Sequence, residues 1–319
     1  MRVLATGASG FLGRAVVRCL QDAGHTVRTL QRRPSGVPGA EDRLGSVTDP
    51  AATAAAVEGV DAIVHLAAKV SLAGDPSEFR AVNVEGTRTL LDAAAAAGVT
   101  RIVHVSSPSV AHAGHALAGV GAEPADPVGA RGEYARTKAE AELLALSRAG
   151  DTASLVAIRP HLVWGPGDTQ LIARVVDRAR RGRLPLLNGG TALIDSTYVD
   201  NAASGIVAAL ARVDEVSGRA YVLTNGEPRP VGDLLAGICR ASGVRPPRFS
   251  VPAALARAAG GLVERVWAVR PGTDEPPMTR FLAEQLSTAH WFDQTEIRRD
   301  LRWTPAVSID EGLRRLSRA

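Results

Sequence analysis

The chain opens with Arg2-Val-Leu-Ala-Thr-Gly-Ala-Ser-Gly-Phe-Leu-Gly13. Val3 to Ala5 form a short apolar run that stops before Gly7, which predicts a buried strand. From Leu12 onward the apolar residues recur at helical spacing, so a helix should follow. Glycines spaced by three lie between the two elements, and such a turn directs the free N–H groups of a helix start at an anion such as a diphosphate. Glycine-rich turns also occur as plain connectors, and here the flanking strand and helix favour cofactor binding.

Strand-like and helix-like segments then alternate through the first half of the chain. The predicted strands are 26–30, 62–68, 101–105 and 154–159, and the predicted helices are 50–57, 84–97 and 134–148. This order implies an α/β fold, a Rossmann-type doubly wound parallel sheet that binds ligands at the carboxyl ends of its strands. Residues 113–133 are rich in Gly, Pro and Ala, so we expect a surface loop over that edge.

The regular alternation weakens after residue 160. We therefore expect residues 1–160 to form the cofactor-binding domain, with 200–225 returning to it. Residues 161–199 and 226–319, which contain prolines and short helical patterns, are expected to form a smaller C-terminal substrate subdomain.

The composition is typical of a soluble globular protein, with 45% hydrophobic and 22% charged residues in 319. No secretory leader and no membrane-spanning apolar run are visible. Cys19 and Cys239 stand among apolar residues, which favours core packing over a disulfide or a metal site and indicates a cytoplasmic protein. Basic and acidic residues are interleaved, so the net charge of +4 indicates a solvated surface and no nucleic-acid partner.

Tyr134 and Lys138 are four residues apart on a predicted helix, so their side chains share one face. A phenol is a weak acid or base at neutral pH until a nearby ammonium favours its ionised form. Lys138 is one of two lysines in a chain that otherwise uses arginine. Ser107 follows a predicted strand and is placed to hydrogen-bond a substrate oxygen. Without the glycine turn these residues would be an exposed Tyr, an exposed Lys and a capping Ser; with it they predict a catalytic set.

Together with the glycine turn, this set resembles the extended short-chain dehydrogenases/reductases, the superfamily of NAD-dependent epimerases and dehydratases. The resemblance covers nearly the whole chain and is carried by residues 6–13, 65–68, 83–87, 106–107, 134–138 and 159–167. It implies that Tyr134 is the general acid/base and that Lys138 lowers its pKa and holds the nicotinamide ribose. It also implies that Ser107, in preference to Ser106, polarises the carbonyl, and that Asn83 supports the active-site backbone. The cofactor-binding residues that it implies are Gly7, Ser9, Gly10, Phe11, Leu12, Gly13, Leu66, Ala67, Ala68, Asn83, Tyr134, Lys138, Pro160 and Leu162.

The end of the second predicted strand indicates NADP(H) in preference to NAD(H). An NAD-binding turn places an acidic side chain there, which accepts from the ribose hydroxyls and would repel a 2′-phosphate. This chain has Gln31, followed by Arg32 and Arg33, whose charge-assisted bonds suit a phosphate. The alternative is that one or both arginines face water.

Departures from the patterns of related enzymes narrow the substrate. Sugar-nucleotide 4,6-dehydratases carry Asp-Glu just after the catalytic hydroxyl residue, where this chain has Pro108-Ser109. Many sugar-nucleotide epimerases grip the diphosphate with an Arg where this chain has Ile194. Residues 198–201 and 292–305 instead resemble the 3β-hydroxysteroid dehydrogenase-like group, and within it the bacterial 2-alkyl-3-ketoalkanoate reductases of olefin biosynthesis. The resemblance therefore implies an NADPH-dependent reductase of a long-chain 2-alkyl-3-keto acid.

Several alternatives remain open on the sequence. The activity could be that of a 3β-hydroxysteroid dehydrogenase or an NDP-sugar epimerase, or the chain could be a non-catalytic NADP-binding redox sensor. Apolar residues at helical spacing in 252–270 fit a lid over an apolar substrate, a packed helix or a peripheral membrane contact. Lys69 and Arg270 are candidates for binding a substrate carboxylate, and a homodimer is compatible with the sequence. The aromatic and apolar residues that line either a core or a pocket are Trp267, Phe281, Leu282, Trp291 and Phe292.

Overall fold

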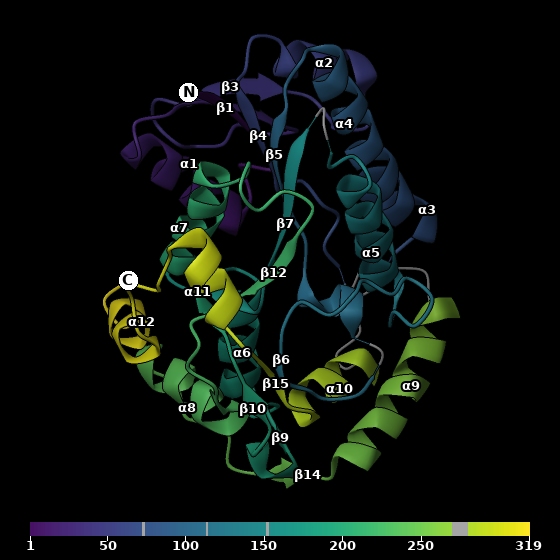
Figure 1. The fold of residues 1–319 in the computed structure, drawn as a ribbon. Coiled ribbons are helices and arrows are strands. Elements are labelled where there is room, and N and C mark those ends of the chain that lie inside the picture. The colour runs from purple at the N-terminus through teal and green to yellow at the C-terminus, as the bar shows by residue number, and fades with distance from the viewer. Residues whose placement is uncertain (72–73, 113, 151–152, 270–279) are drawn as a thin grey trace.

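The computed structural model describes residues 1–71, 74–112, 114–150, 153–269 and 280–319. A seven-stranded sheet with the order β12-β7-β5-β4-β1-β2-β3 lies at its centre, and neighbouring strands are parallel throughout (Figure 1). The strands are β1 (Arg2–Thr6), β2 (Thr26–Gln31), β3 (Glu41–Leu44), β4 (Ala62–His65), β5 (Arg101–Val105), β7 (Ser154–Pro160) and β12 (Ala220–Leu223). The predicted Rossmann-type parallel sheet is therefore confirmed.

Helices cover both faces of this sheet, as Figure 1 shows. One face packs against α1 (Phe11–Asp22) and α7 (Val199–Ala211), and the other against α2 (Pro50–Val57), α4 (Gly86–Ala96) and α5 (Glu133–Leu146). Successive side chains of a strand point to opposite faces, so Val3 and Ala5 enter the first core and Leu4 the second. This double burial explains why the strands are nearly continuous apolar runs.

The strand order reverses between β1 and β4. From β1 the chain builds outward through β2 and β3, whereas β4 begins the opposite half of the sheet. Thr6 and His65, the last residues of β1 and β4, are register partners. Connections leave these two strands in opposite directions, which opens a crevice for a ligand at their carboxyl ends.

The rest of the chain forms smaller sheets and helices around a second core that includes Trp164, Tyr198 and Ile238. A four-stranded sheet has the order β13-β10-β15-β6, and two further pairs are β8 with β11 and β9 with β14. These strands are β6 (Leu117–Val120), β8 (Val163–Trp164), β9 (Leu186–Leu187), β10 (Leu193–Ile194), β11 (Thr197–Tyr198), β13 (Arg229–Pro230), β14 (Ser250–Val251) and β15 (His290–Phe292). The helices are α6 (Leu171–Arg180), α8 (Val231–Ala241), α9 (Ala253–Val269), α10 (Arg280–Ser287), α11 (Thr295–Leu301) and α12 (Ile309–Leu316).

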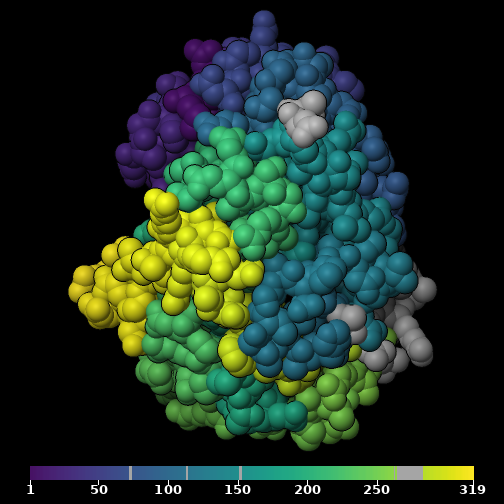
Figure 2. Space-filling model, in the orientation of Figure 1, coloured from purple at the N-terminus to yellow at the C-terminus, as the bar shows by residue number. Residues whose placement is uncertain are grey.

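The prediction that residues 113–133 form a surface loop is wrong in part. Leu117–Val120 is strand β6, which pairs in parallel with β15, and Leu117 is buried against Val222 and Phe292. In Figure 2 the blue segment that contains β6 lies against the yellow C-terminal segment. Its pairing partner is more than 160 residues further along the chain, so local composition carries no sign of it.

Two other segments, β3 and the region before α4, differ from the prediction. Strand β3 was not predicted because its residues are polar or exposed at the sheet edge. Helix 84–97 is confirmed from Gly86 onward, but it is preceded by the helical turn α3 (Pro76–Phe79) and a π-helical segment, Arg80–Glu85. Short 3₁₀ turns are found at Pro108–Ala111 and Asn188–Gly190.

Within the segment 252–270, residues Ala253–Val269 form helix α9. It packs Ala253 and Ala256 against Leu187 and Ala283, while Leu255 is 63% exposed. Among the residues that the structure describes, no helix is long and apolar enough to cross a bilayer. Arg270 and the side chains of Trp267, Phe281 and Leu282 lie outside the described residues.

Candidate active site

The glycine turn brings backbone unusually close to backbone. Gly7 has a φ of 71°, and a Cβ on it would lie 2.8 Å from the amide nitrogen of Ala67. A Cβ on Gly13 would collide with the carbonyl oxygen of Gly7. Gly10 begins α1 without any side-chain cap, so the first N–H groups of the helix keep their capacity to donate. An uncapped helix start beside a surface without side chains fits the diphosphate of a dinucleotide.

The remaining predicted cofactor residues line the same edge of the sheet. Ser9, Phe11 and Leu12 lie on the turn and the first turn of α1, Leu66 to Ala68 follow β4, Pro160 ends β7, and Leu162 comes two residues later. Leu162 adopts a φ of 42°, a conformation that is uncommon for a residue with a side chain and is concentrated at functional sites. The chain thus offers one continuous edge from the diphosphate turn to the end of β7.

The residues at the end of β2 have distinct surroundings. Arg32 and Arg33 are exposed, and neither has an ion-pair partner within the described ranges. Gln31 is buried, and its Nε2 donates to Thr29 Oγ1 at 2.8 Å and to Asp42 Oδ1 at 3.2 Å. Asp42, on the unpredicted strand β3, also accepts from Thr29 and from the Ser35 amide. The Asp42 carboxylate is therefore engaged in local hydrogen bonds, whereas the guanidinium groups of Arg32 and Arg33 have no ion-pair partner among the described residues.

Ser107 is oriented by Ser109. Ser109 Oγ donates to Ser107 Oγ at 2.9 Å, and the Ser109 amide donates to the same atom at 3.3 Å. Ser107 Oγ therefore keeps its own hydrogen for another acceptor, and this hydroxyl is near enough to Tyr134 to lower the pKa of its phenol. Ser106 is buried, and its Oγ has no partner among the described residues. Of the two serines, Ser107 is the one whose hydroxyl affects the pKa of Tyr134. The hydrogen bond from Ser109 to Ser107 was not predicted.

Tyr134 is placed to act as a proton donor at neutral pH. Burial raises the pKa of its phenol, and the hydrogen bond from Ser107 lowers it by less. The phenol therefore keeps its proton at pH 7, the state needed to protonate a carbonyl oxygen during reduction.

Lys138 lies one helical turn after Tyr134 and is buried. Its Nζ donates to the carbonyl oxygen of Val105, the last residue of β5, at 2.7 Å. Burial lowers the pKa of the Lys138 ammonium to about 8, and the charge of Glu142 opposes this shift. The hydrogen bond to Val105 holds the Lys138 ammonium at the carboxyl edge of the sheet. This ammonium has two further N–H donors.

Asn83 connects this helix to the end of β4. Its Oδ1 accepts from the Lys69 amide at 2.7 Å, and its Nδ2 donates to Thr137 Oγ1 at 3.0 Å. Thr137 in turn donates to the carbonyl oxygen of Glu133. The buried Asn83 side chain therefore links the start of α5 to the segment after Leu66, through a π-helical turn of the kind that is frequent at functional sites.

Lys69, one of the two candidates for a carboxylate-binding cation, is already paired. Its ammonium forms an ion pair with Glu78 and lies 5.2 Å from the centre of the Phe79 ring. The other candidate, Arg270, lies outside the described residues. The geometry therefore lends no support to Lys69 as a free cation.

Three buried histidines from distant segments meet below the carboxyl edge, and sequence analysis did not single them out. His112 Nδ1 lies 3.4 Å from His290 Nε2, and the His161 ring centre lies 6.0 Å from that of His290 and 5.2 Å from that of Phe292. Burial lowers the pKa of His161 to about 4 and that of His290 to about 3, so both are neutral at pH 7. Within the described ranges, no cluster of His, Cys, Asp and Glu side chains has the arrangement of a metal site.

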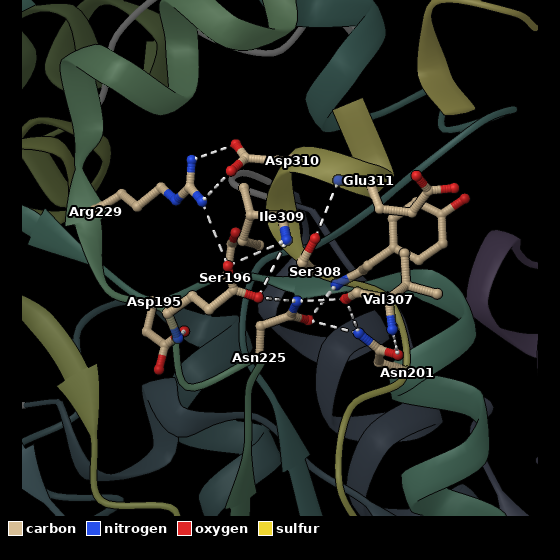
Figure 3. Close-up of polar contacts among 12 residues, drawn as sticks. Asp195, Ser196, Asn201, Asn225, Arg229, Val307, Ser308, Ile309, Asp310 and Glu311 are labelled. Carbon is tan, nitrogen blue, oxygen red and sulfur yellow. Dashed lines mark hydrogen bonds and ion pairs between the residues drawn. The ribbon is translucent and has the colours of Figure 1, made fainter. Parts of the chain in front are cut away.

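Asn201 and Asn225 have a structural function that the sequence did not predict. Asn225 Oδ1 accepts from the Tyr198 amide at 3.0 Å and from Asn201 Nδ2 at 2.9 Å. Both asparagine side chains donate to the carbonyl oxygen of Val307, at 2.7 and 2.8 Å, as Figure 3 shows. The pair therefore clamps the C-terminal segment onto the core, which explains the need for polar residues at these buried positions.

A diphosphate turn at the switch point of a parallel sheet, with Ser, Tyr and Lys along the same edge, defines a nicotinamide-dependent oxidoreductase. The chain belongs to the NAD dependent epimerase/dehydratase family, which matches residues 3–224, and thus to the extended short-chain dehydrogenases/reductases.

Two relatives and one solved structure are similar over nearly the full chain. A 2-alkyl-3-oxoalkanoate reductase of Stenotrophomonas maltophilia (strain K279a) is 41% identical, with 99% of this chain and 98% of the relative covered. A 3 beta-hydroxysteroid dehydrogenase/Delta 5-->4-isomerase of Mycobacterium tuberculosis (strain CDC 1551 / Oshkosh) is 34% identical, with 98% and 88% covered. The crystal structure of a short-chain dehydrogenase/reductase superfamily protein from Agrobacterium tumefaciens with bound NAD aligns with a TM-score of 0.78 at 26% identity, covering 100% and 96% of the two chains.

Proposed function

We propose that this protein is an NADPH-dependent ketoreductase, reversible as a dehydrogenase, that acts on the 3-keto group of a long-chain 2-alkyl-3-keto acid. The observation that carries the substrate class is the 41% identity, over 99% of the chain, to a 2-alkyl-3-oxoalkanoate reductase. Ile194 supports an apolar substrate, because it is 2% exposed within an apolar core at the position where sugar-nucleotide epimerases carry a diphosphate-binding Arg.

In the proposed reaction Tyr134 gives its phenolic proton to the carbonyl oxygen of the substrate. A reduced nicotinamide, when bound, supplies hydride for the carbonyl carbon. Ser107 donates to the same carbonyl oxygen, with its hydroxyl oriented by Ser109. The Lys138 ammonium, held by Val105, stabilises the negative charge that Tyr134 acquires as the proton leaves. Asn83 and Thr137 keep α5 in register with the sheet edge during this transfer.

The cofactor would lie along the edge that begins at the glycine turn. Gly7 to Gly13 would hold the diphosphate, Lys138 the nicotinamide ribose, and Pro160 with Leu162 would lie beside the nicotinamide. Residues 1–160 with 200–225 would form the cofactor domain, and 161–199 with 226–319 the substrate subdomain. This division is supported by β12, which pairs with β7 of the central sheet, and by the separate core around Trp164. Strand β6 is the exception, because it pairs with β15 in the smaller four-stranded sheet.

The preference for NADP(H) is proposed from the unpaired guanidinium groups of Arg32 and Arg33. A 2′-phosphate offers each of them a charge-assisted hydrogen bond without first breaking an ion pair. Gln31 carries no charge that would repel the phosphate, and the carboxylate of Asp42 is engaged with Thr29.

A substrate series tests the proposal. Purified protein is assayed with NADPH and 3-keto acids of increasing chain length, with a 3-ketosteroid and a UDP-sugar as controls. If apolar side chains line the pocket, kcat/KM should rise by up to about fourfold for each additional buried methylene, since one methylene contributes about 0.8 kcal/mol. A 2-alkyl branch should raise kcat/KM further, because the branch adds buried apolar surface.

The competing functions predict different outcomes in the same assay. A 3β-hydroxysteroid dehydrogenase, favoured as second candidate by the 34% identical relative, would prefer the steroid over every keto acid. An epimerase would act on the UDP-sugar, and a redox sensor would bind NADPH without consuming it. Each of these results contradicts the proposed substrate.

A further inference from the structure

The buried ring of His65 lies between two threonine hydroxyls from different parts of the cofactor edge. Its Nδ1 is 2.7 Å from Thr6 Oγ1, and its Nε2 is 2.9 Å from Thr87 Oγ1. Thr6 ends β1 immediately before Gly7, and Thr87 is the second residue of α4, the helix that follows the π-helical segment containing Asn83. His65 itself is the last residue of β4 and is 2% exposed.

The hydrogen-bond partners determine which ring nitrogen of His65 carries the proton. Thr87 Oγ1 donates its single hydrogen to the carbonyl oxygen of Asn83 at 2.7 Å, so it must accept from His65 Nε2–H. In a neutral ring Nδ1 is then an acceptor and takes the hydroxyl hydrogen of Thr6. Thr6 Oγ1 in turn accepts from the amide of Ala67 at 3.1 Å. Every donor in this series has one acceptor when the ring is neutral.

The surroundings also favour the neutral ring. Burial and the nearby Lys138 ammonium lower the pKa of His65 to about 3. A protonated ring would place a second cation beside Lys138, and its Nδ1–H would leave the hydroxyl hydrogen of Thr6 without its acceptor. The ring therefore serves as an uncharged connector that donates on one side and accepts on the other.

The hydrogen bonds on the two sides of the His65 ring lead to two different parts of the candidate site. On the Thr6 side, the Ala67 backbone packs directly against Gly7 of the diphosphate turn. On the Thr87 side, Asn83 donates to Thr137 of α5, the helix that carries Tyr134 and Lys138.

We propose that His65 is a positioning residue: as the neutral Nε2–H tautomer it fixes the diphosphate turn relative to the segment that supports α5. The distance between the bound cofactor and the proton donor is then set partly through this ring. The inference rests on the proposed function only for its effect on turnover, because the tautomer and the effect on cofactor affinity do not depend on the substrate.

Matched threonine variants test the proposal. Thr6→Val and Thr87→Val remove the hydroxyls at nearly constant shape, Thr6→Ser and Thr87→Ser keep them, and cofactor dissociation constants are measured for each. We expect each Val variant to weaken NADPH binding by about tenfold and each Ser variant by less than about threefold. Thr89→Val is the control, because Thr89 donates to the Glu85 carbonyl oxygen on the same helix without contacting His65. Its cofactor affinity should be unchanged.

A double-mutant cycle separates positioning from simple stability. The effects of Thr6→Val and Thr87→Val on cofactor affinity should be non-additive by at least about threefold, because one ring joins the two hydroxyls. In a His65→Phe background the same two effects should become additive. Additive effects in the unmodified protein would overturn the proposal, even if both variants were less stable to urea.

The tautomer has a direct spectroscopic signature. In ¹⁵N-labelled protein at pH 7, the His65 ring should show a one-bond proton coupling at Nε2 and none at Nδ1. A doubly protonated ring or the Nδ1–H tautomer would also overturn the proposal. If the tautomer and the cycle are as expected but no ketone is reduced, the proposed function fails while the role of His65 stands.

Discussion

Glu142 and Arg159 form an ion pair whose side chains are 1% and 2% exposed, and Glu142 lies on α5, the helix that carries Tyr134 and Lys138. Arg159 Nε donates to Glu142 Oε2 at 2.9 Å, Nη2 donates to Oε1, and Nη1 donates to the carbonyl oxygen of Glu123 at 2.6 Å. One guanidinium therefore joins α5, β7 and the segment after β6. A buried charge that loses such a partner has no solvent to replace it.

Replacing Glu142 by Gln should lower the free energy of unfolding by about 3–5 kcal/mol, because Arg159 keeps its buried charge without a counterion. Urea denaturation measures the change. The double variant Glu142→Leu with Arg159→Met, which removes both charges, should lose less than Glu142→Gln alone. Glu140→Gln is the matched control on the same helix: its partners Arg80 and Arg136 are partly exposed, so the loss should stay below about 1 kcal/mol. An equal loss in Glu140→Gln would contradict the prediction.

The pH dependence of turnover should report Lys138. Its pKa is lowered to about 8 by burial, so the ammonium is present below that pH and is lost as the pH rises through it. If the ammonium stabilises ionised Tyr134, kcat should fall on the alkaline side with an apparent pKa near this value. Lys138→Arg keeps the charge at every accessible pH, so its weaker activity should show no such limb. An unchanged alkaline limb in Lys138→Arg would assign the titration to another group.

Tyr134→Phe should reduce turnover by at least about a hundredfold, because it removes the proton donor and keeps the ring. Cofactor affinity and thermal stability should change little, since phenylalanine keeps the ring and removes only the hydroxyl. Stopped-flow reduction with NADPH and the preferred substrate measures the effect. Retention of most activity would exclude Tyr134 as the general acid.

Cofactor choice should depend on the two residues after β2. Arg32→Ala with Arg33→Ala should weaken NADPH binding by at least about tenfold and leave NADH binding within about twofold, because only the 2′-phosphate distinguishes the two. Gln31→Asp should lower NADPH affinity as well, by placing a negative charge beside that phosphate. Titration by fluorescence quenching gives the dissociation constants of both cofactors for the wild type and each variant, and equal losses for both cofactors would count against the phosphate contact.

His104→Phe should stabilise the fold by about 1–3 kcal/mol, since a buried polar atom without a hydrogen bond costs that much. Neither ring nitrogen of His104 has a partner among the described residues, and its ring centre lies 5.4 Å from that of His65. Burial and Lys138 lower the pKa of His104 well below its usual value of 6.5. The wild-type protein thus loses stability as the pH falls below 6.5, because the unfolded chain binds a proton that the folded ring refuses. The free energy of unfolding of His104→Phe should fall less than that of the wild type as the pH is lowered below 6.5. If His104→Phe is less stable than the wild type at pH 7, the prediction is wrong.

The sequence predicted the central sheet well because its strands are buried on both faces. Runs such as Ala62–His65 must be apolar to enter two cores, so their signal is local and strong. The glycine turn was predicted equally well, since the close contact of Gly7 with Ala67 excludes any side chain at residue 7. Strands β3 and β6 were missed for the opposite reason: one is polar at an edge, and the other depends on a distant partner.

The candidate site could be predicted as a set of residues but not as a set of contacts. Ser107, Tyr134 and Lys138 were proposed from spacing and resemblance, and their catalytic roles stay a prediction. In the structure the Ser107 hydroxyl lowers the pKa of Tyr134. The hydrogen bond from Lys138 to Val105 and the engagement of Lys69 by Glu78 depend on the packing of separate elements. The hydrogen bonds of His65 and Asn225 could likewise not be predicted, because each side chain joins partners from distant parts of the sequence.

The pairing of β6 with β15 imposes an order on biosynthesis. Ser107 and Tyr134 leave the ribosome early, but the strand between them can pair with His290–Phe292 only when nearly the whole chain has been made. Until then β6 presents an open edge, and contacts of such long range form slowly. The central parallel sheet can fold while the ribosome is still translating, whereas the sheet that contains β6 and β15 must be completed later. Chaperone dependence and aggregation in a recombinant host should therefore be governed by the last thirty or so residues, and slow translation before them should not help.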